Sequence, residues 1–212
     1  QVSHAARTFA SLGVAPPKGV PATARAFRRD CLEVDVVKDG RALTLFVCHF
    51  KSMHGGRART REVRLSEANA VRTLIGERFA DPASAEWVIL GDLNDYVEED
   101  GVPVSDSGLD PLLADGFAVD LAAHCLPDPF ERWSHHYAKD DTYAALDHIL
   151  VSPRLAERNR RARPIFVRAG LAWRVARHKG FRLPGVGWSG PKASDHCPLV
   201  ATLAFEGAPA GL

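Results

Sequence analysis

The stretch Trp87-Val88-Ile89-Leu90-Gly91-Asp92-Leu93-Asn94-Asp95 indicates how this chain folds and where its polar groups gather. Its apolar residues, bounded by a turn signal, are typical of a short buried strand. Gly91 permits a tight bend where that strand ends. Asp92 and Asn94 then stand at the rim of a sheet, where ligand sites of α/β folds usually lie. An ordinary turn has a similar composition, so the rest of the chain must decide between the two interpretations.

The composition predicts a single domain over residues 1–212, because 46% of the residues are hydrophobic and 25% are charged. Residues 1–27 are expected to be rich in loops, with proline and glycine gathered in 15–21. No run of about 18 apolar residues is present, so no membrane span is predicted. The four cysteines form no C-x-x-C pair, which argues against a zinc knuckle. The sequence assigns no cellular compartment.

Charge is segregated along the chain, although the formal net charge is only +1. Residues 81–151 hold sixteen Asp and Glu and two Lys and Arg, whereas residues 152–193 hold eleven Lys and Arg and one Glu. The acidic part suits a cation, and the basic part suits a polyanion. For the basic segment alone, a solvated surface without a partner is the alternative.

Hydrophobic periodicity predicts a hairpin followed by a β-α-β unit. Residues 31–37 alternate between apolar and acidic side chains, Asp39-Gly40 forms the turn, and residues 43–50 form the returning strand. Apolar residues at three- and four-residue spacing predict a helix over 59–79. The strand at 87–90 then completes the unit.

The later elements are shorter. The pattern predicts a helix over 109–114, a loop over 133–137, and strands over 145–151, 165–167 and 199–205. Residues 154–163 are expected to form a helix end and a loop. His135 and His136 are adjacent, and neighbouring side chains on a strand point to opposite faces. Joint metal ligation by this pair is therefore not favoured.

Acidic, amide and imidazole groups stand at the ends of these elements: His49, Asp92, Asn94, Asp147, Asp195 and His196. Phosphoester hydrolysis requires such a set, because a divalent cation prefers carboxylate oxygen and a histidine held by an aspartate can donate or accept a proton. Lys51 and Arg57 flank a Gly-Gly pair and suit an anion; a surface loop is the alternative for them. A Ser-His-Asp hydrolase is a rival interpretation, but no Gly-x-Ser-x-Gly motif is present.

Four motifs resemble, in order, those of the endonuclease/exonuclease/phosphatase superfamily, which includes deoxyribonuclease I-like nucleases. They are His49-Phe50-Lys51-Ser52, Gly91-Asp92-Leu93-Asn94, Leu146-Asp147-His148-Ile149-Leu150 and Ser194-Asp195-His196-Cys197-Pro198. The resemblance covers about residues 28–206. It implies an α/β fold, a four-layer α/β sandwich of two packed mixed β-sheets flanked by helices.

The resemblance also implies roles for the site residues. Asp92 would orient or activate water, and Asn94 would donate to the phosphate. Asp195 would bind the metal, directly or through water. His196 would contact the scissile phosphate, and Asp147 would hold His196 in place. In addition, His49 would be a second histidine on the phosphate, with Lys51 and Arg57 as candidate substrate-binding residues.

One departure from the family pattern concerns the beginning of the chain. The family begins with a strand that carries an Asn, and the Glu that is its principal metal ligand ends a later strand. Nothing in residues 1–30 matches either feature. We therefore expect that the N-terminal part of the fold is missing from this sequence and that the metal site is incomplete as written.

The resemblance and the basic segment together favour a hydrolase of phosphodiester bonds that depends on Mg²⁺ or Mn²⁺, and a nuclease above other members. Nucleic acid or another phosphoester is the expected substrate. A phosphatase or a lipid phosphodiesterase on the same scaffold is the first alternative, because fold does not determine substrate. The second alternative is a catalytically silent module that binds nucleic acid. The sequence does not indicate an oligomeric state.

Overall fold

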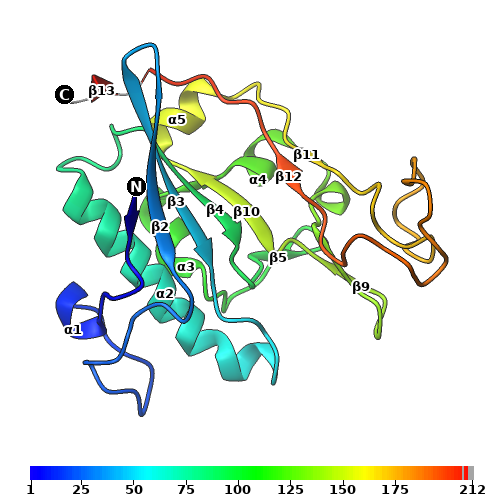
Figure 1. Ribbon diagram of the computed structural model, residues 1–212, viewed down its shortest axis with the longest axis horizontal. Coiled ribbons are helices and arrows are strands. Elements are labelled where there is room, and N and C mark those ends of the chain that lie inside the picture. Colours follow the sequence, from blue (N-terminus) through cyan, green and yellow to red (C-terminus); the bar gives the residue numbers. More distant parts are fainter. Residues whose placement is uncertain (207, 210–212) are drawn as a thin grey trace.

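The computed structural model describes residues 1–206 and 208–209. Its main element is a mixed sheet with the strand order β1-β2-β3-β4-β10-β7, in which β13 also pairs with β3 (Figure 1). The bounds of these strands are β1 Val2–Ser3, β2 Cys31–Lys38, β3 Arg41–His49, β4 Trp87–Asp92, β7 Val119–Asp120, β10 Asp147–Val151 and β13 Ala208–Pro209.

The predicted hairpin is present as β2 and β3. Its strands pair in register from Cys31 opposite Cys48 to Lys38 opposite Arg41. The two turn residues, Asp39 and Gly40, have φ angles of 53° and 72°. A two-residue turn with positive φ at both positions matches the right-handed twist of its strands. The Asp-Gly signal therefore predicted the turn, and the structure adds the register of the two strands.

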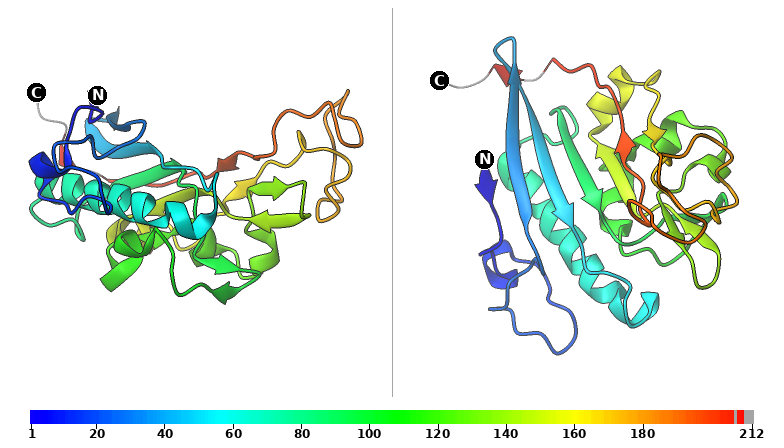
Figure 2. Two further views of the ribbon diagram at one scale, coloured as in Figure 1. Left: turned by 90° about the horizontal axis from the view of Figure 1, so that it is seen from below. Right: turned by 45° about the vertical axis from the view of Figure 1, so that its right-hand side comes forward.

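The β-α-β unit is also confirmed, because β3 and β4 are parallel and α2 (Arg57–Arg78) connects them. The long helix lies across one face of the sheet (Figure 2). Its buried face presents the small and branched side chains of Ala68, Val71, Leu74 and Ile75, which belong to one core cluster with Phe46 of β3 and Ile89 of β4. Burial of this apolar stripe is what places β3 and β4 side by side.

Gly91 allows β4 to approach β3 at the point where both strands end. Its φ is +131°, and a Cβ built on it would lie 2.0 Å from the carbonyl oxygen of Cys48. No L side chain fits at such a distance. The glycine in the opening stretch is therefore required by the close contact of two strands, and it keeps Asp92 level with the end of β3.

The opposite face of the sheet is covered partly by the chain after β12 (Leu199–Val200). We predicted a strand over 199–205, but only β12 is a strand, and it pairs with β11 (Ile165–Phe166). The backbone of Ala204 is hydrogen-bonded instead to the side-chain amide of Asn159, at 2.8 Å for each of the two contacts. A side chain thus takes the place of a neighbouring strand as the hydrogen-bond partner of this backbone. The apolar pattern of 199–205 does not indicate such a partner.

The remaining helices are short: α1 Phe9–Leu12, α3 Asp110–Leu113, α4 Leu121–Cys125 and α5 Pro153–Arg158, with 3₁₀ turns at Ala114–Gly116 and Pro129–Glu131. The helix predicted near 109–114 is thus confirmed. Residues 133–137 differ from the loop that we predicted, because His135–Tyr137 form β8, which pairs with β9 (Thr142–Ala144). Aromatic side chains favour strands, and a strand with one buried face and one exposed face also accommodates polar side chains.

The predicted α/β class, with a mixed sheet and helices outside it, is confirmed. Besides the main sheet, the described residues form three two-stranded sheets, from β5 (Glu98–Glu99) with β6 (Val102–Pro103), β8 with β9, and β11 with β12. In the part of the chain that the structure describes, no helix combines the length and the apolar composition needed to cross a membrane.

Candidate active site

Three polar side chains come together because three neighbouring strands meet at one edge of the sheet. In the parallel pair β3–β4, His49 stands beside Asp92. In the antiparallel pair β4–β10, Asp147 stands opposite Asp92. Side chains in register on neighbouring strands lie on the same face, about 4.5–5.5 Å apart. The sheet register therefore makes one cluster from residues that are far apart in the sequence.

His196 joins this cluster from the last part of the chain. Its Nδ1 lies 2.8 Å from Oδ2 of Asp147. Because a carboxylate only accepts hydrogen bonds, Nδ1 is the donor, and Nε2 is directed elsewhere. The hydrogen bond that His196 donates to Asp147, together with the negative charge of Asp147, raises the pKa of His196 above its ordinary value, although partial burial opposes this. The same contact lowers the pKa of Asp147, against the opposing effect of its burial.

The segment that carries His196 is held by the strand β8. The backbone N–H of Cys197 donates to the carbonyl of Ser134 at 2.7 Å, and the N–H of His136 donates to the carbonyl of Asp195 at 3.0 Å. The buried Ser134 hydroxyl in turn accepts the backbone N–H of Asp147 at 2.9 Å. Ser134 thus connects the start of β10 to the segment of His196, which fixes the separation of the two partners.

Asp92, Asp147 and His196 offer ligand atoms that all lie within 4.8 Å of one another. Burial and the like charge of Asp147 raise the pKa of Asp92, so two carboxylates crowd one partly buried place. A divalent cation would relieve that repulsion, and carboxylate oxygens are the donors that Mg²⁺ and Mn²⁺ prefer. The residues present therefore fit the ion that the family implies.

Asn94 lies directly behind this group. Its φ is 53°, a left-handed conformation that asparagine tolerates better than most residues. Its backbone N–H donates to Oδ1 of Asp92 at 2.9 Å, and its side-chain nitrogen donates to the carbonyl of Phe50 at 3.1 Å. An amide nitrogen carries two hydrogens, so one remains for a substrate oxygen.

His49 is half-exposed at the rim, and its Nε2 lies 3.4 Å from Oδ2 of Asp92. Burial and the positive charge of Arg29 lower the pKa of His49, and the attraction of Asp92 does not offset them. The imidazole is therefore neutral near pH 7, and it can donate from one ring nitrogen and accept at the other.

Lys51 has local contacts. Its ammonium donates to the carbonyl of Ser52 at 2.8 Å, and its backbone N–H donates to the buried carboxylate of Glu67 on α2 at 2.8 Å. Glu67 thereby anchors the loop after β3, a role that its place on the predicted helix did not indicate. Substrate binding by Lys51 stays a prediction.

Arg57 is held by two carboxylates, Asp95 at 2.7 Å and Asp106 at 3.0 Å. Asp195 is half-exposed, lies 3.8 Å from the ammonium of Lys192, and is not one of the three residues whose ligand atoms gather. Substrate binding by Arg57 and metal binding by Asp195 therefore stay predictions, and these contacts do not add to them.

His135 is a site neighbour that sequence reasoning missed. Its ring centroid lies 4.6 Å from that of His196, and burial together with the charge of His196 lowers the pKa of His135 to about 4. His136, the next residue on β8, is directed away from this ring and lies 2.7 Å from Asp141. Side chains alternate between the two faces of a strand, and this alternation could have separated His135 from His136. The signal applies only if 133–137 is recognised as containing a strand, and we predicted a loop there.

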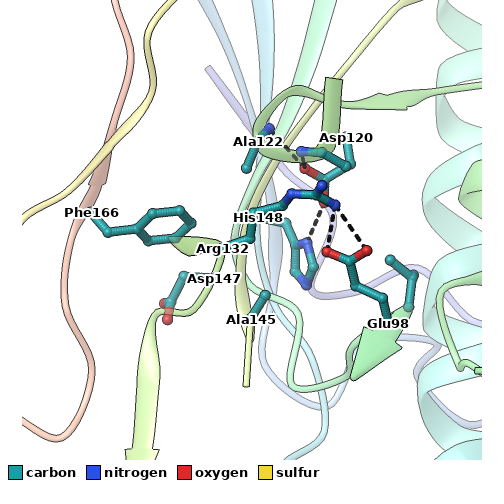
Figure 3. Close-up of a pocket in the computed structure, with 10 residues that line it drawn as sticks. Glu98, Asp120, Ala122, Arg132, Ala145, Asp147, His148 and Phe166 are labelled. Atoms are coloured by element: carbon teal, nitrogen blue, oxygen red, sulfur yellow. Dashed lines mark hydrogen bonds and ion pairs between the residues drawn. The ribbon is translucent and has the colours of Figure 1, made fainter. Parts of the chain in front are cut away.

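Behind Asp147, the next residue of β10 makes a buried ion pair. Nδ1 of His148 lies 2.8 Å from Oδ2 of Asp120, and Nε2 lies 2.9 Å from the carbonyl oxygen of Asp95. Figure 3 shows His148 beside Asp120, with Asp147 directed to the other side of the strand. Arg132 and Glu98 form a second pair next to them, at 2.6 Å. Both ring nitrogens of His148 face acceptors, so both carry hydrogen and the ring is cationic.

This pair predicts a pH-dependent stability. Burial would lower the pKa of His148, but the hydrogen bond and charge of Asp120 outweigh it and raise that pKa. Burial would raise the pKa of Asp120, but His148 lowers it. The stabilisation is therefore complete between the ordinary pKa values, about 3.9 and 6.5. It is lost as the pH rises through the raised pKa of His148, or falls through the lowered pKa of Asp120.

We expect Asp120→Asn to reduce the free energy of unfolding more at about pH 5.5 than at about pH 9. Asparagine keeps the N-cap of α4, where Asp120 accepts the N–H groups of Ala122 and Ala123. Urea denaturation at both pH values measures the difference. Asp115→Asn, at a side chain that is 89% exposed, is the control and should show none. An equal loss at both pH values for Asp120→Asn would contradict a charged His148.

Comparison with known proteins bears on the family and the fold of the chain. The Endonuclease/Exonuclease/phosphatase family matches residues 17–171. No curated protein sequence matches the chain. Truncated TDP2 from Caenorhabditis elegans is similar in structure, with a TM-score of 0.52, 16% identity, and coverage of 90% of this chain and 63% of that one. A humanized D. rerio TDP2 with 14 mutations has a TM-score of 0.55, 17% identity, and coverage of 84% and 63%.

At these identities the two structures support the fold alone, and the chain spans less than two thirds of the length of either. The family match covers most of the chain and includes three of the strands that end at the site, β3, β4 and β10. The chain belongs to the endonuclease/exonuclease/phosphatase family.

Proposed function

We propose that the protein hydrolyses phosphodiester bonds in nucleic acid and depends on Mg²⁺ or Mn²⁺. The observation that carries the proposal is the contact of His196 with Asp147 beside Asp92, at the edge where β3, β4 and β10 meet. Family membership supports hydrolysis of a phosphoester. The basic segment 152–193 supports a polyanionic substrate.

Asp92 and Asp147 are the residues whose carboxylate oxygens would hold the ion, because a His196 that is protonated on both ring nitrogens has no lone pair for a cation. When bound, the cation supplies positive charge to the phosphoryl oxygens, where negative charge increases during hydrolysis. Asp195, which the resemblance implied as a metal ligand, would have to turn from Lys192 or act through a water molecule to join them.

The side chains of the site supply the proton chemistry. With Nδ1 bonded to Asp147, a protonated His196 donates from Nε2 to a phosphate oxygen, and Asp147 stabilises the imidazolium. Asp92 orients the attacking water and accepts its proton. Asn94 donates its second amide hydrogen to the phosphate.

His49 completes the proposed site as a neutral donor at the rim, next to Asp92. Lys51 and Arg57 would bind flanking phosphates. Arg57 would share its guanidinium with the two carboxylates that hold it, and Lys51 would release Ser52. Their contribution is therefore smaller than that of the three clustered residues.

Metal dependence is the first test. We expect the protein to hydrolyse bis(p-nitrophenyl) phosphate and to nick plasmid DNA with Mg²⁺ or Mn²⁺, and we expect a chelator to abolish both activities. Asp92→Asn should raise the metal concentration needed for half-maximal rate, because it removes a ligand charge and the repulsion that a cation relieves. Asp115→Asn, at an exposed aspartate, is the matched control.

Equal rates with and without chelator would refute the metal site. Hydrolysis of a phosphomonoester or of a phospholipid, but not of either diester substrate, would instead support the phosphatase or the lipid enzyme on this scaffold. Tight binding of DNA without turnover of any of these substrates would support the silent module.

A further inference from the structure

The segment 168–193, here called the protruding loop, extends from the body of the molecule between β11 and β12 (Figure 2). It contains no regular helix or strand. Its composition is one-sided, with six Lys and Arg and no Asp or Glu. Such a surface attracts polyanions and repels other basic surfaces.

Three aromatic rings of the protruding loop face solvent. Trp173 is 52% exposed, Phe181 is 71% exposed and Trp188 is 72% exposed. Large aromatic side chains are seldom exposed to solvent to this extent, and clusters of exposed aromatic side chains mark contact surfaces. Arg174, Lys179 and Lys192 lie between or beside the rings along the chain. Arg177 also lies between them, but its guanidinium is paired with Asp100 at 2.8 Å.

The rings are attached to a folded base. Leu171, Ala172 and Val175 are buried in a small apolar cluster with Trp133 and Phe166 of the body. This cluster packs part of the protruding loop against the body of the molecule, and the exposed rings are not part of it. The arrangement is preorganised, so that binding a partner orders few additional side chains.

Backbone contacts bring together the two segments that carry Trp173 and Trp188. The N–H of Trp173 donates to the carbonyl of Gly187 at 3.0 Å, and the N–H of Arg174 donates to the carbonyl of Trp188 at 2.9 Å. The two tryptophans thus occupy adjacent segments although fifteen positions separate them in the sequence. Figure 1 shows these segments side by side at the far end from the hairpin of β2 and β3.

Alternating rings and cations match one class of polyanion best. A single-stranded nucleic acid alternates flat bases with phosphates, and its bases are free to stack on aromatic side chains. In a duplex the faces of the bases are covered by their neighbours, so exposed rings gain little from it. An anionic membrane also attracts the cations and accepts aromatic side chains, but it does not require its apolar contacts to be flat rings, since leucine serves as well.

The protruding loop also leads into the active site. Its last residue, Ala193, donates its N–H to the carbonyl of Gly170 at 2.9 Å, and the chain then continues directly to Asp195 and His196. We infer that the protruding loop is a base-stacking surface that binds the unpaired strand of a nucleic acid next to the scissile phosphate. This inference rests on the proposed function, because it assigns the substrate of that site as single-stranded.

Binding of a fluorescent oligodeoxythymidylate, measured by anisotropy in the presence of a chelator, tests the inference without turnover. We expect tighter binding to the single strand than to a duplex of equal length. Trp188→Ala should weaken single-strand binding about 5- to 150-fold. Trp188→Phe keeps a ring and should bind nearly as the wild type does. Trp188→Leu keeps the apolar surface but not the ring, and it should bind as weakly as Trp188→Ala.

Val37→Ala, at an exposed apolar residue of β2, is the control and should bind as the wild type does. Hydrolysis of bis(p-nitrophenyl) phosphate, which is too small to reach the rings, should be unchanged in Trp188→Ala and shows that the variant is folded. If the wild type hydrolyses this reporter and Trp188→Ala still binds the oligonucleotide normally, the inference is wrong and the proposed function stands. If neither the wild type nor any variant hydrolyses the reporter, the proposed function fails. The single-strand binding data then still decide whether the protruding loop binds an unpaired strand.

A membrane surface gives a different pattern. Co-sedimentation with phosphatidylserine vesicles that Trp188→Leu retains, together with equal affinity for single strand and duplex, would overturn the inference in favour of a lipid partner.

Discussion

We expect the His196→Ala protein to hydrolyse a phosphodiester about 10²- to 10⁴-fold more slowly than the wild type at saturating substrate. The variant loses the proton donor that Asp147 orients from 2.8 Å. Because both side chains of the pair are partly exposed, the fold should remain intact. Steady-state kinetics with saturating metal measures the effect, and circular dichroism verifies the fold.

A variant of the partner separates orientation from proton donation. Asp147→Asn removes the charge that raises the pKa of His196, so that pKa should fall towards its ordinary value. A protonated donor is active below its pKa. The rate should therefore decline at lower pH in Asp147→Asn than in the wild type. The double variant with His196→Ala should be no slower than the slower single variant, because the two residues act as one unit.

His124→Ala is the matched control, since His124 is an exposed histidine on α4 outside the site. Its kinetics should equal those of the wild type. A His196→Ala protein with more than a tenth of the wild-type kcat would contradict the proposed role. An unchanged pH profile in Asp147→Asn would show that His196 is not the group that titrates.

The second large effect concerns stability. Asp95→Ala should reduce the free energy of unfolding by about 3–5 kcal/mol. Asp95 and Arg64 are both fully buried, and the carboxylate lies 2.9 Å from Nε of Arg64. Asp95 also accepts the N–H of Gly108 at 2.9 Å and the guanidinium of Arg57 at 2.7 Å. Truncation leaves a buried cation without its counter-charge, which costs more than the pair contributes. Urea denaturation measures the change.

Asp106→Ala is the control, because this exposed carboxylate also pairs with Arg57 but lies at the surface, where ion pairs contribute little. A double replacement, Asp95→Leu with Arg64→Met, removes both charges and should be less destabilised than Asp95→Ala alone. An unfolding free energy of Asp95→Ala within about 1 kcal/mol of the wild type would show that water reaches Arg64. Asp95 directly follows Asn94, so Asp95→Ala should also lower the hydrolysis rate.

Local patterns were sufficient for several parts of this protein. The Asp39-Gly40 turn between two strand patterns predicted the hairpin, and the apolar stripe of 59–79 predicted α2. These signals are reliable because each depends on residues close in sequence, whose side chains the helix or strand geometry places on one face. The same locality explains why the polar residues at strand ends were recognised as a group.

Other features depend on partners that the sequence does not indicate. The chain at 201–206 has the alternation of a strand, yet the amide of Asn159 takes its backbone hydrogen bonds. Arg57 follows a Gly-Gly pair that suits an anion, yet its guanidinium is held by Asp95 and Asp106. In each case a partner about forty positions away competes with the local preference, and only the folded chain brings it near.

By itself, the sequence determined the α/β class, the hairpin, the β3-α2-β4 unit and the set of acidic and imidazole residues that stand at strand ends. Tertiary structure decided which of them meet. The register of β3, β4 and β10 places His49, Asp92 and Asp147 side by side, and the pairing of the last segment with β8 carries His196 to Asp147 and places His135 against it. The physical reason is that strand pairing and core burial join residues far apart in the sequence, whereas a sequence pattern reports only the geometry of neighbours.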